Sequence, residues 1–442
     1  MAPGTSRLVR PLVTLACAGL ALGVAACGGS GGTGSGGSGS GGSGSGGSAR
    51  APGVTDTSVT VGTHQPLTGP AAAGYSDISK ATKAYFDYVN SKGGVHGRTI
   101  TYTVKDDGYN PANTQKVVRE LVLQDKVFAV LGGLGTPTHT GVLDFLKTNK
   151  VPDLFVASGS LNWNNVGKYP NTFGFQSNYT TETKISGAYV KANLPGKKVC
   201  FLGQDDDFGR DALKGLTIAL GEGGVADRQT YVTSNPNLAP QIGSFKAAGC
   251  EVVQLATVPP FTALAIGTAA KLGFKPQWVS TSVGADLPTL KAVLGEAAPL
   301  LQGLLGTNYL PSSFDASNPW ITAFKQINTE FNPGAPFTGN TVYGMSVGYL
   351  FVEALQKNGK ELTRASIEQT VSSGTLTGSG LVPLRFSGTD HTGYSGARMG
   401  RVEGDQQILF GPTYVTDDSD APPTEYTGAP VNPPAAAIPA AD

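Results

Sequence analysis

The chain has 442 residues, with 32 basic and 32 acidic side chains and a formal net charge of zero. This length allows two domains of ordinary size. The balanced charge offers no basic patch for nucleic acid and no acidic tail for storing cations. Four cysteines are too few for a disulfide scaffold, and His64, His96, His139 and His391 lack the spacing of metal ligands. We therefore expect no nucleic-acid partner, no metal and no cofactor.

The N-terminal segment has the pattern of an export signal followed by a tether. A basic start precedes an apolar run, residues 12–26, that is too short to span a bilayer. Small residues directly before Cys27 resemble a bacterial lipobox, in which the cysteine is lipidated and becomes the mature N-terminus. We expect a lipoprotein signal peptide over 1–26 and, over 27–53, a lipidated Cys27 with a Gly/Ser linker, which anchor an exported protein to the outer face of the cell membrane. The alternative is an ordinary secretory signal in which Cys27 is incidental.

From residue 58 onward, the chain alternates between strand and helix patterns. The strand patterns of the first series cover 58–63, 99–105, 127–131 and 153–156, and the helical patterns cover 74–92, 111–125 and a segment that ends at 147. The strand patterns of the second series cover 197–202, 226–232, 250–256 and 277–280, and the helical patterns cover 208–220, 239–248 and 261–272. This alternation predicts doubly wound parallel sheets in two α/β lobes. Ligands bind beyond the carboxyl ends of such strands, so two facing lobes define a cleft.

Two further features concern the second series and the C-terminus. Cys200 and Cys250 lie on the first and third strands of the second series, which can be neighbours in a doubly wound order. Export would place them where disulfides persist, so we predict a bridge, with two buried thiols as the alternative. Residues 417–442 are rich in Pro, Ala and Asp, and we expect them to be disordered.

Several short motifs occur in the order and spacing of a known family. They are VTVG at 59–62, PLTGP at 66–70, VNSKGGVHGR at 89–98, Asp106-Asp107 followed by Pro111, and DFGR at 207–210 after a strand. Together the motifs resemble the branched-chain amino-acid and amide-binding family of periplasmic receptors that serve ATP-driven importers. The resemblance covers roughly residues 54–412. No single motif is decisive, but five in register argue against chance.

The resemblance implies a periplasmic binding protein-like α/β fold, with two doubly wound parallel-sheet lobes joined by a three-crossover hinge. We place the crossovers near Gln176, Thr307 and Phe386. The resulting first lobe is 54–176 plus 308–385, and the second lobe is 177–307 plus 386–416.

The function implied is that of a substrate-binding lipoprotein of an ABC importer. It would capture a small solute (an amino acid, amide or carboxylate) in the cleft and deliver it to a membrane permease. The implied partners are the solute, the permease and ATPase subunits, and the membrane through the lipid anchor. We expect a monomer.

Two loops of the first lobe offer polar groups at strand ends. Gly135 and Thr136 lie between a strand end and a helix start, where N–H groups and a hydroxyl suit a carboxylate or another acceptor. The alternative is that Thr136 only caps the helix. The segment Ser158-Gly159-Ser160 is small enough for a ligand to approach the backbone, or it is an ordinary turn. Trp163 follows this segment. We expect its side chain either to line the cleft or, alternatively, to belong to the core.

Other candidates come from positions that match the family. Tyr75 matches an aromatic residue that covers the ligand, and Phe208 matches an aromatic residue that packs against it from the second lobe. Amino-acid-binding members receive the ligand ammonium with an acidic residue, but the matching place here is nearest Ser282. Asp286 lies a turn later and could substitute. A buried ammonium without a counter-ion costs several kcal/mol. We therefore predict a ligand with a carboxylate or amide head and an apolar body, with a neutral-polar amino acid as the main competitor.

An enzymatic function finds little support in the sequence. The segment Gly132-Gly133-Leu134-Gly135 is not a dinucleotide-binding fingerprint, and Ser158-Gly159-Ser160 is not a nucleophile elbow. His64, near the first strand end, and Tyr343, on a late helix, are weaker candidates to face the cleft. We expect no catalysis. A receptor that reports ligand occupancy to a sensor kinase uses the same fold and remains an alternative; neighbouring permease genes would favour import, and a neighbouring kinase gene would favour sensing.

Overall fold

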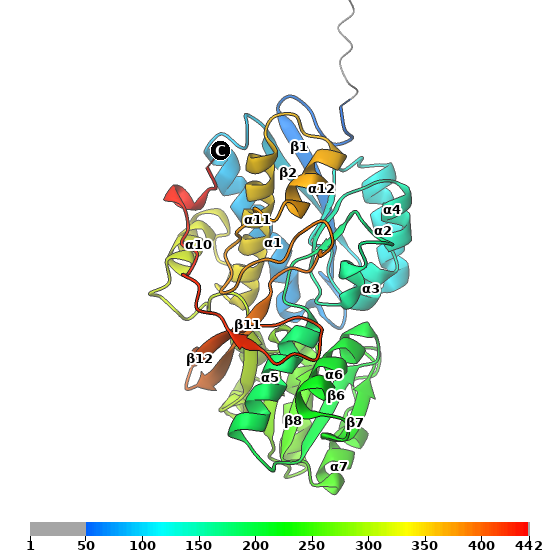
Figure 1. The fold of residues 1–442 in the computed structure, drawn as a ribbon, viewed down its shortest axis with the longest axis vertical. Helices are drawn as coiled ribbons and strands as arrows, with labels where there is room; N and C mark the ends of the chain where they lie inside the picture. Colours follow the sequence, from blue (N-terminus) through cyan, green and yellow to red (C-terminus); the bar gives the residue numbers. More distant parts are fainter. Residues whose placement is uncertain (1–49, 441–442) are drawn as a thin grey trace, which may run out of the picture. The chain divides into compact units, whose positions relative to one another are not determined.

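The computed structural model describes residues 50–440. The predicted signal peptide, the lipobox at Cys27 and nearly all of the linker lie outside this range. Within the described residues, no helix combines the length and the apolar character needed to cross a bilayer. Two sheets with their covering helices make up this part of the chain (Figure 1).

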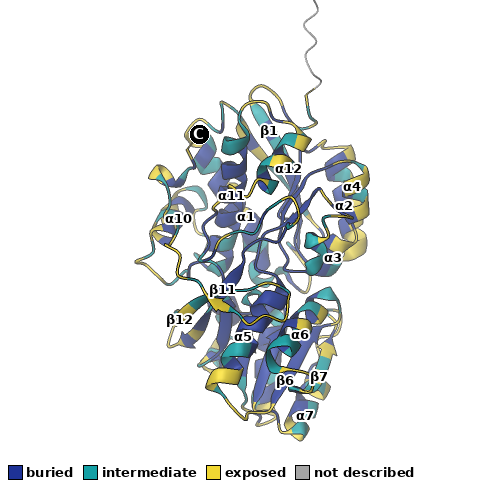
Figure 2. Ribbon diagram, viewed as in Figure 1, coloured by how far each residue is buried: buried dark blue, intermediate teal, exposed yellow. Residues whose placement is uncertain are grey.

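The first lobe is built on a five-stranded parallel sheet in the order β2-β1-β3-β4-β5. Its strands are β1 (Ser58–Gln65), β2 (Thr99–Asp106), β3 (Val130–Leu131), β4 (Asp153–Val156) and β5 (Thr172–Gly174). Its helices are α1 (Ala72–Ser91), α2 (Pro111–Leu123), α3 (Thr136–Thr140), α4 (Leu143–Thr148), α10 (Pro319–Phe331), α11 (Gly339–Asn358) and α12 (Arg364–Ser372). Figure 2 shows α1 and α11 largely buried, whereas α2 and α4 carry exposed faces.

Small residues let α1 and α11 pack closely. A Cβ at Gly344 of α11 would overlap the carbonyl oxygen of Ile78 in α1, and a Cβ at Gly348 would lie 2.9 Å from the Tyr85 ring. The Tyr85 ring meets that of Tyr349 edge-on, with 6.3 Å between centroids. Such edge-to-face contacts stabilise a core beyond the area they bury.

The second lobe is built on an eight-stranded sheet in the order β13-β12-β11-β10-β9-β8-β6-β7. Its strands are β6 (Val199–Gln204), β7 (Val225–Tyr231), β8 (Val252–Ala256), β9 (Gln277–Ser280), β10 (Leu305–Asn308), β11 (Gly396–Glu403), β12 (Gln406–Val415) and β13 (Thr424–Glu425). Its helices are α5 (Tyr179–Asn193), α6 (Asp207–Leu220), α7 (Ala239–Ala248), α8 (Pro259–Lys271) and α9 (Leu287–Leu294). The strands from β7 to β10 pair in parallel, and β11 to β13 add an antiparallel edge. The predicted α/β class with two lobes is confirmed, although the antiparallel edge was not predicted.

A disulfide joins Cys200, in β6, to Cys250, which lies just before β8. The two strands are parallel neighbours, and the Cα atoms of the cysteines are 5.9 Å apart. The bridge predicted from the sequence is therefore present in the structure.

The chain passes between the lobes more often than expected. The first two passages lie at residues 176–178 and 308–309, close to their predicted places. The third was predicted near Phe386, but Phe386 and Tyr394 both belong to the first lobe's core. The chain leaves that core only at Ser395, immediately before β11. The prediction was wrong because the aromatic side chains that hold this segment, Phe155 and Phe173, come from strands far away in the sequence.

The expectation of a disordered tail over 417–442 is also wrong for residues 417–440. This segment leaves the second lobe and returns along the first, where Figure 1 shows it in red. Its carbonyl groups accept hydrogen bonds from buried donors: Lys184 Nζ donates to Ser419 O at 2.6 Å, Trp320 Nε1 to Val431 O at 2.7 Å, and Tyr85 Oη to Ala437 O at 2.7 Å. Composition alone predicts disorder, but these donors would otherwise be buried without partners.

Candidate ligand-binding site

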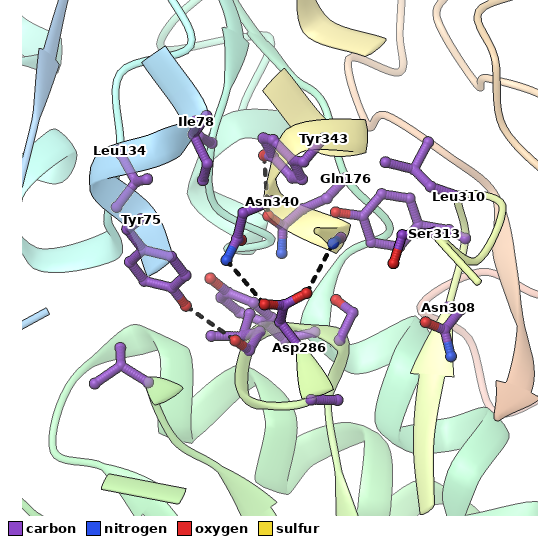
Figure 3. Close-up of a pocket in the computed structure, with 18 of the residues that line it drawn as sticks. Tyr75, Ile78, Leu134, Gln176, Asp286, Asn308, Leu310, Ser313, Asn340 and Tyr343 are labelled. Atoms are coloured by element: carbon purple, nitrogen blue, oxygen red, sulfur yellow. Dashed lines mark hydrogen bonds between the residues drawn. The ribbon is translucent and has the colours of Figure 1, made fainter. Parts of the chain in front are cut away.

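A pocket lies between the two lobes, with about 910 Å³ of empty space that includes its opening to solvent. Residues of both lobes and of the connecting segments line it, as Figure 3 shows. The pocket therefore has the location that the two-lobed architecture predicts.

Direct hydrogen bonds between the lobes close one rim of this pocket. Tyr75 Oη, on α1, donates to Val283 O of the second lobe at 3.1 Å. Gly339 N, at the start of α11, donates to Asp286 Oδ1 at 2.8 Å, and Asn340 Nδ2 donates to Thr289 Oγ1 at 3.3 Å. The structure therefore shows the lobes in a closed arrangement.

A second set of hydrogen bonds also joins the two lobes. Ser160 Oγ and Leu161 N, from the first lobe, donate to Asp211 Oδ2 at 3.1 and 2.9 Å. Gln204 Nε2, from β6, donates to the hydroxyl oxygen of Tyr109 at 3.2 Å. Burial raises the pKa of Asp211 to about 6, and the two donors from the first lobe oppose that rise.

Six of the residues singled out from the sequence line the pocket. They are Tyr75, Gly135, Phe208, Ser282, Asp286 and Tyr343. Phe208, in the first turn of α6, packs its ring against Tyr179 with centroids 4.3 Å apart. The two lobes thus contribute aromatic walls from helix starts, as the family pattern implies.

The polar loops of the first lobe are placed differently from the prediction. Thr136 and Ser158 hydrogen-bond to each other, with 2.7 Å between their hydroxyl oxygens, and Tyr179 Oη donates to Ser158 Oγ at 3.2 Å. Neither hydroxyl lines the main pocket. The segment Ser158-Gly159-Ser160 and Trp163 line a separate, smaller pocket of about 210 Å³. These hydroxyls were expected to face the ligand, but they bind one another and the opposing lobe instead.

His64 lies in the core rather than in the cleft. His64 Nδ1 is 2.8 Å from Asp107 Oδ2, and His64 Nε2 is 2.8 Å from His139 Nδ1. His139 Nε2 is in turn 2.8 Å from Asp153 Oδ2, and all four side chains are fully buried. Burial lowers the pKa of His64. This chain of buried polar groups joins β1, the residue after β2, α3 and the start of β4, and none of its four members lines the pocket. Its role is therefore structural.

Ser282 leads to an acid that the sequence reasoning missed. Ser282 N and Oγ donate to the two carboxylate oxygens of Glu182 at 2.7 and 2.9 Å, and Thr307 Oγ1 also donates to Glu182. Burial raises the Glu182 pKa to about 7, despite these hydrogen bonds. Glu182 lies on α5, a helix that the sequence patterns did not predict, and it contacts the pocket wall only from behind. An acid therefore supports this wall without lining the pocket.

Asp286 lines the pocket with its oxygens already engaged. It caps α9 by accepting a hydrogen bond from Thr289 N at 3.1 Å, and it also accepts from Thr289 Oγ1 and Gly339 N. Burial raises its pKa, and these donors oppose the rise. The geometry makes Asp286 a junction between the lobes more than a free partner for an ammonium group.

Two lining residues at the chain passages were also missed. Gln176 Oε1 accepts from Tyr343 Oη at 3.3 Å, whereas Gln176 Nε2 is buried without a partner among the described residues. Asn308 Nδ2, at the end of β10, is likewise buried without a partner in the described chain. These two residues could have been proposed from the sequence. Both lie at or next to crossovers predicted there, and segments that connect two lobes border the cleft between them.

No cluster of three or more His, Cys, Asp or Glu side chains that could hold a metal occurs within residues 50–440. The residues that line the pocket offer mainly aromatic faces, carboxamides and hydroxyls.

Comparison with known proteins agrees with this geometry. A family model described as periplasmic binding protein matches residues 58–407. The Leu/Ile/Val-binding protein homolog 3 of Brucella melitensis is 24% identical over 206 residues, which cover 44% of this chain and 53% of that protein. The chain thus aligns with about half the length of this curated relative.

Solved structures show the same fold. A branched chain amino acid ABC transporter protein from Thermus thermophilus, with bound valine, is 22% identical and superposes with a TM-score of 0.72, covering 83% of this chain and 98% of that one. A fatty acid ABC transporter substrate-binding protein from Thermomonospora curvata is 20% identical with a TM-score of 0.74, covering 84% and 95% of the two chains. The family match extends over most of the chain and confirms the resemblance that the motifs indicated. The chain belongs to the periplasmic binding protein family.

Proposed function

We propose that this protein is the substrate-binding lipoprotein of an ABC importer, which captures a small solute between its lobes and delivers it to a membrane permease. The observation that carries the proposal is the pocket lined from both lobes, with Tyr75 on one side and Phe208 on the other. A ligand can drive closure only through contacts that differ between the open and closed states. A solute that touches both lobes meets this condition, because it gains its second set of contacts only on closure.

The kinds of relatives support the import role. The proteins from Thermus thermophilus and Thermomonospora curvata are both described as parts of ABC transporters, although their named ligands differ. Membership of a periplasmic family implies an exported protein, and the lipobox at Cys27 supplies the anchor in this proposal. We assign ligand contact to five lining residues from the two lobes: Tyr75, Gly135, Phe208, Ser282 and Tyr343.

A thermal-shift screen of the mature protein against amino acids, amides and aromatic acids tests solute binding. At least one compound should raise the melting temperature, and Tyr75→Ala and Phe208→Ala should each remove that shift. Leu123→Ala is the control, because Leu123 is 48% exposed on α2 and lies outside the pocket. A ligand whose shift survives both pocket substitutions would bind elsewhere and contradict the proposal.

Cell fractionation of Cys27→Ala tests the anchor separately. The variant should leave the membrane fraction or accumulate as an unprocessed precursor, because it lacks the lipidated sulfur. A Cys27→Ala protein that still fractionates with membranes as a processed lipoprotein would show that the lipobox interpretation is wrong.

A further inference from the structure

Four buried titratable side chains of the first lobe, here called the histidine chain, are joined in series by three hydrogen bonds. Asp107 Oδ2 is 2.8 Å from His64 Nδ1, and His139 Nε2 is 2.8 Å from Asp153 Oδ2. Between them, His64 Nε2 is 2.8 Å from His139 Nδ1. The two ring centroids are 5.1 Å apart and the ring planes differ by 16°, so the facing nitrogens lie nearly in one plane. All three distances are those of hydrogen bonds.

The number of protons in the histidine chain follows from its geometry. Each of the three hydrogen bonds needs one proton, ionised carboxylates bring none, and a neutral imidazole carries one N–H. Two neutral rings therefore supply only two protons, and one of the three contacts would be a pair of facing lone pairs. A third proton completes the series and makes one ring an imidazolium. A fourth proton would set two N–H groups against each other between the rings.

The Asp107 end of the chain is well supplied with neutral donors. Tyr109 N donates to Asp107 Oδ1 at 2.9 Å, and Thr114 Oγ1 donates to Asp107 Oδ2 at 2.9 Å. These donors stabilise the ionised carboxylate without a cation. Burial lowers the pKa of His64, so this ring is the poorer place for the extra charge. Tyr109 also lines the interlobe pocket, which ties this end of the chain to the pocket wall.

The Asp153 end has fewer neutral donors. Thr172 Oγ1 donates to Asp153 Oδ2 at 3.0 Å, whereas Asp153 Oδ1 is buried without a partner among the described residues. Beside this end, Trp163 meets the His139 ring edge-on, and His391 Nδ1 contacts Thr172 O. Within residues 50–440, no lysine or arginine pairs with either aspartate. A buried carboxylate in such surroundings needs a charged partner, and His139 is the one in contact with it.

The loop after β3 lies directly against the bond between the two rings. A Cβ at Gly133 would lie 2.5 Å from His139 Nδ1 and 2.6 Å from His64 Nε2. The next two residues, Leu134 and Gly135, line the interlobe pocket, and Figure 3 labels Leu134 there. Any change in the separation of the two rings is therefore transmitted to the wall of the pocket.

We propose that the histidine chain holds three protons at neutral pH, with His139 as a buried imidazolium, and that this proton keeps the first-lobe wall of the pocket in place. Loss of the proton leaves lone pairs facing each other and drives the rings apart against Gly133. The pocket wall is thereby sensitive to pH. The proton count does not depend on the proposed solute-binding function, so either can fail without the other.

Nuclear magnetic resonance of the mature protein with ¹⁵N-labelled histidine rings counts the protons directly. The variants His64→Gln and His139→Gln assign the signals. At pH 7.5, three of the four ring nitrogens of this pair should carry protons, and the bare nitrogen should belong to His64. Two protonated nitrogens, the count for two neutral imidazoles, would overturn the inference, and so would four.

The pH dependence of stability is a second measurement, which a neutral pair of rings would leave flat. Histidines of the unfolded chain lose their charge above a pKa of about 6.5, whereas the folded chain keeps one proton, so stability falls as pH rises. Relative to the double variant His64→Gln, His139→Gln, the unfolding equilibrium constant should rise about ten-fold from pH 7.5 to pH 8.5. A ratio that stays constant in urea unfolding would overturn the inference. If the double variant does not fold, the ring count in the wild type decides alone.

The link to the pocket wall is tested without any solute. Backbone amide signals of Tyr109, Leu134 and Gly135 are followed with the ring count from pH 6 to pH 9, with exposed Gly223 of the second lobe as the reference. The three signals should hold steady while the count is three and shift when it falls to two. A fall in the count that leaves all three signals in place, or shifts at a constant count, would overturn the link between the chain and the wall.

Discussion

At the scale of single residues, Gly74 is a point where the lobes meet. It interrupts the regular geometry of α1 with a φ of +81°, and a Cβ there would overlap Thr289 Oγ1 and Asn340 Nδ2. Thr289 belongs to the second lobe, so a side chain at Gly74 would obstruct closure directly.

We predict that Gly74→Ala weakens ligand binding at least about ten-fold, since overpacking a close contact costs roughly 1–3 kcal/mol. Gly97→Ala is the control: Gly97 has the same φ of +81°, but nothing lies within 4 Å of its added Cβ. Calorimetry on both variants separates obstruction from backbone strain. Equal losses in the two variants would contradict the contribution of Gly74 to closure.

Glu182 should make stability depend on pH. Its pKa is raised from 4.5 to about 7 by burial, so the unfolded chain releases this proton at lower pH than the folded protein. The contribution of Glu182 to stability is therefore full below pH 4.5 and declines as pH rises through 7, by about 2 kcal/mol between pH 5 and 7.

Glu182→Gln mimics the protonated side chain, because an amide can donate to Ser282 Oγ while its oxygen accepts from Ser282 N. Urea unfolding measures the free energy of unfolding at pH 5 and at pH 7. The decrease from pH 5 to pH 7 should be smaller in Glu182→Gln than in the wild type by about 2 kcal/mol. An identical pH dependence in the two proteins would show that Glu182 is ionised in the folded state throughout this range.

At the scale of elements, the disulfide joins neighbouring strands of the second sheet. Cys200 and Cys250 close a loop with a sequence separation of 50. The double variant Cys200→Ser, Cys250→Ser should lose about 4 kcal/mol of unfolding free energy, because the bridge restricts the unfolded chain. Urea unfolding measures this loss, and reductant should lower the stability of the wild type but not that of the double variant. Two free thiols in the exported protein, detected by mass spectrometry under denaturing and non-reducing conditions, would contradict the bridge.

The elements that sequence patterns predicted well are those with local periodicity. The strand at 153–156 and the helix at 239–248 have the predicted bounds, because alternation and helical spacing are properties of short windows. Helix α5 was missed since its buried face carries threonine, glutamate and lysine side chains, whose partners come from other elements. Its mostly polar sequence shows no apolar stripe.

The candidate site also contains residues that could be predicted from the sequence and residues that could not. Motif positions such as Tyr75 and Phe208 line the pocket, because the family pattern carries their place in the fold. The expectation for Thr136 and Ser160 was not met, since the direction of a hydroxyl depends on a partner that the sequence does not identify: Ser158 for one and Asp211 for the other.

At the scale of the whole described chain, the passages between the lobes determine how closure is possible. The passages near Gln176 and Asn308 border the pocket, and each of these two residues has a buried amide nitrogen without a partner in the described chain. The tail adds a further link, because residues 417–419 contact Lys184 on α5 and Val431 contacts Trp320 in the first lobe. We therefore expect ligand binding to depend on the arrangement of these passages.

Small-angle X-ray scattering of the mature protein, with and without a saturating ligand from the thermal-shift screen, tests the central claim most directly. We predict that the radius of gyration falls on ligand addition, because contacts from both lobes hold the closed arrangement. In Gly74→Ala the decrease should be smaller or absent at the same ligand concentration. A radius of gyration that stays unchanged in the wild type at full occupancy would contradict capture of the solute by closure of the two lobes.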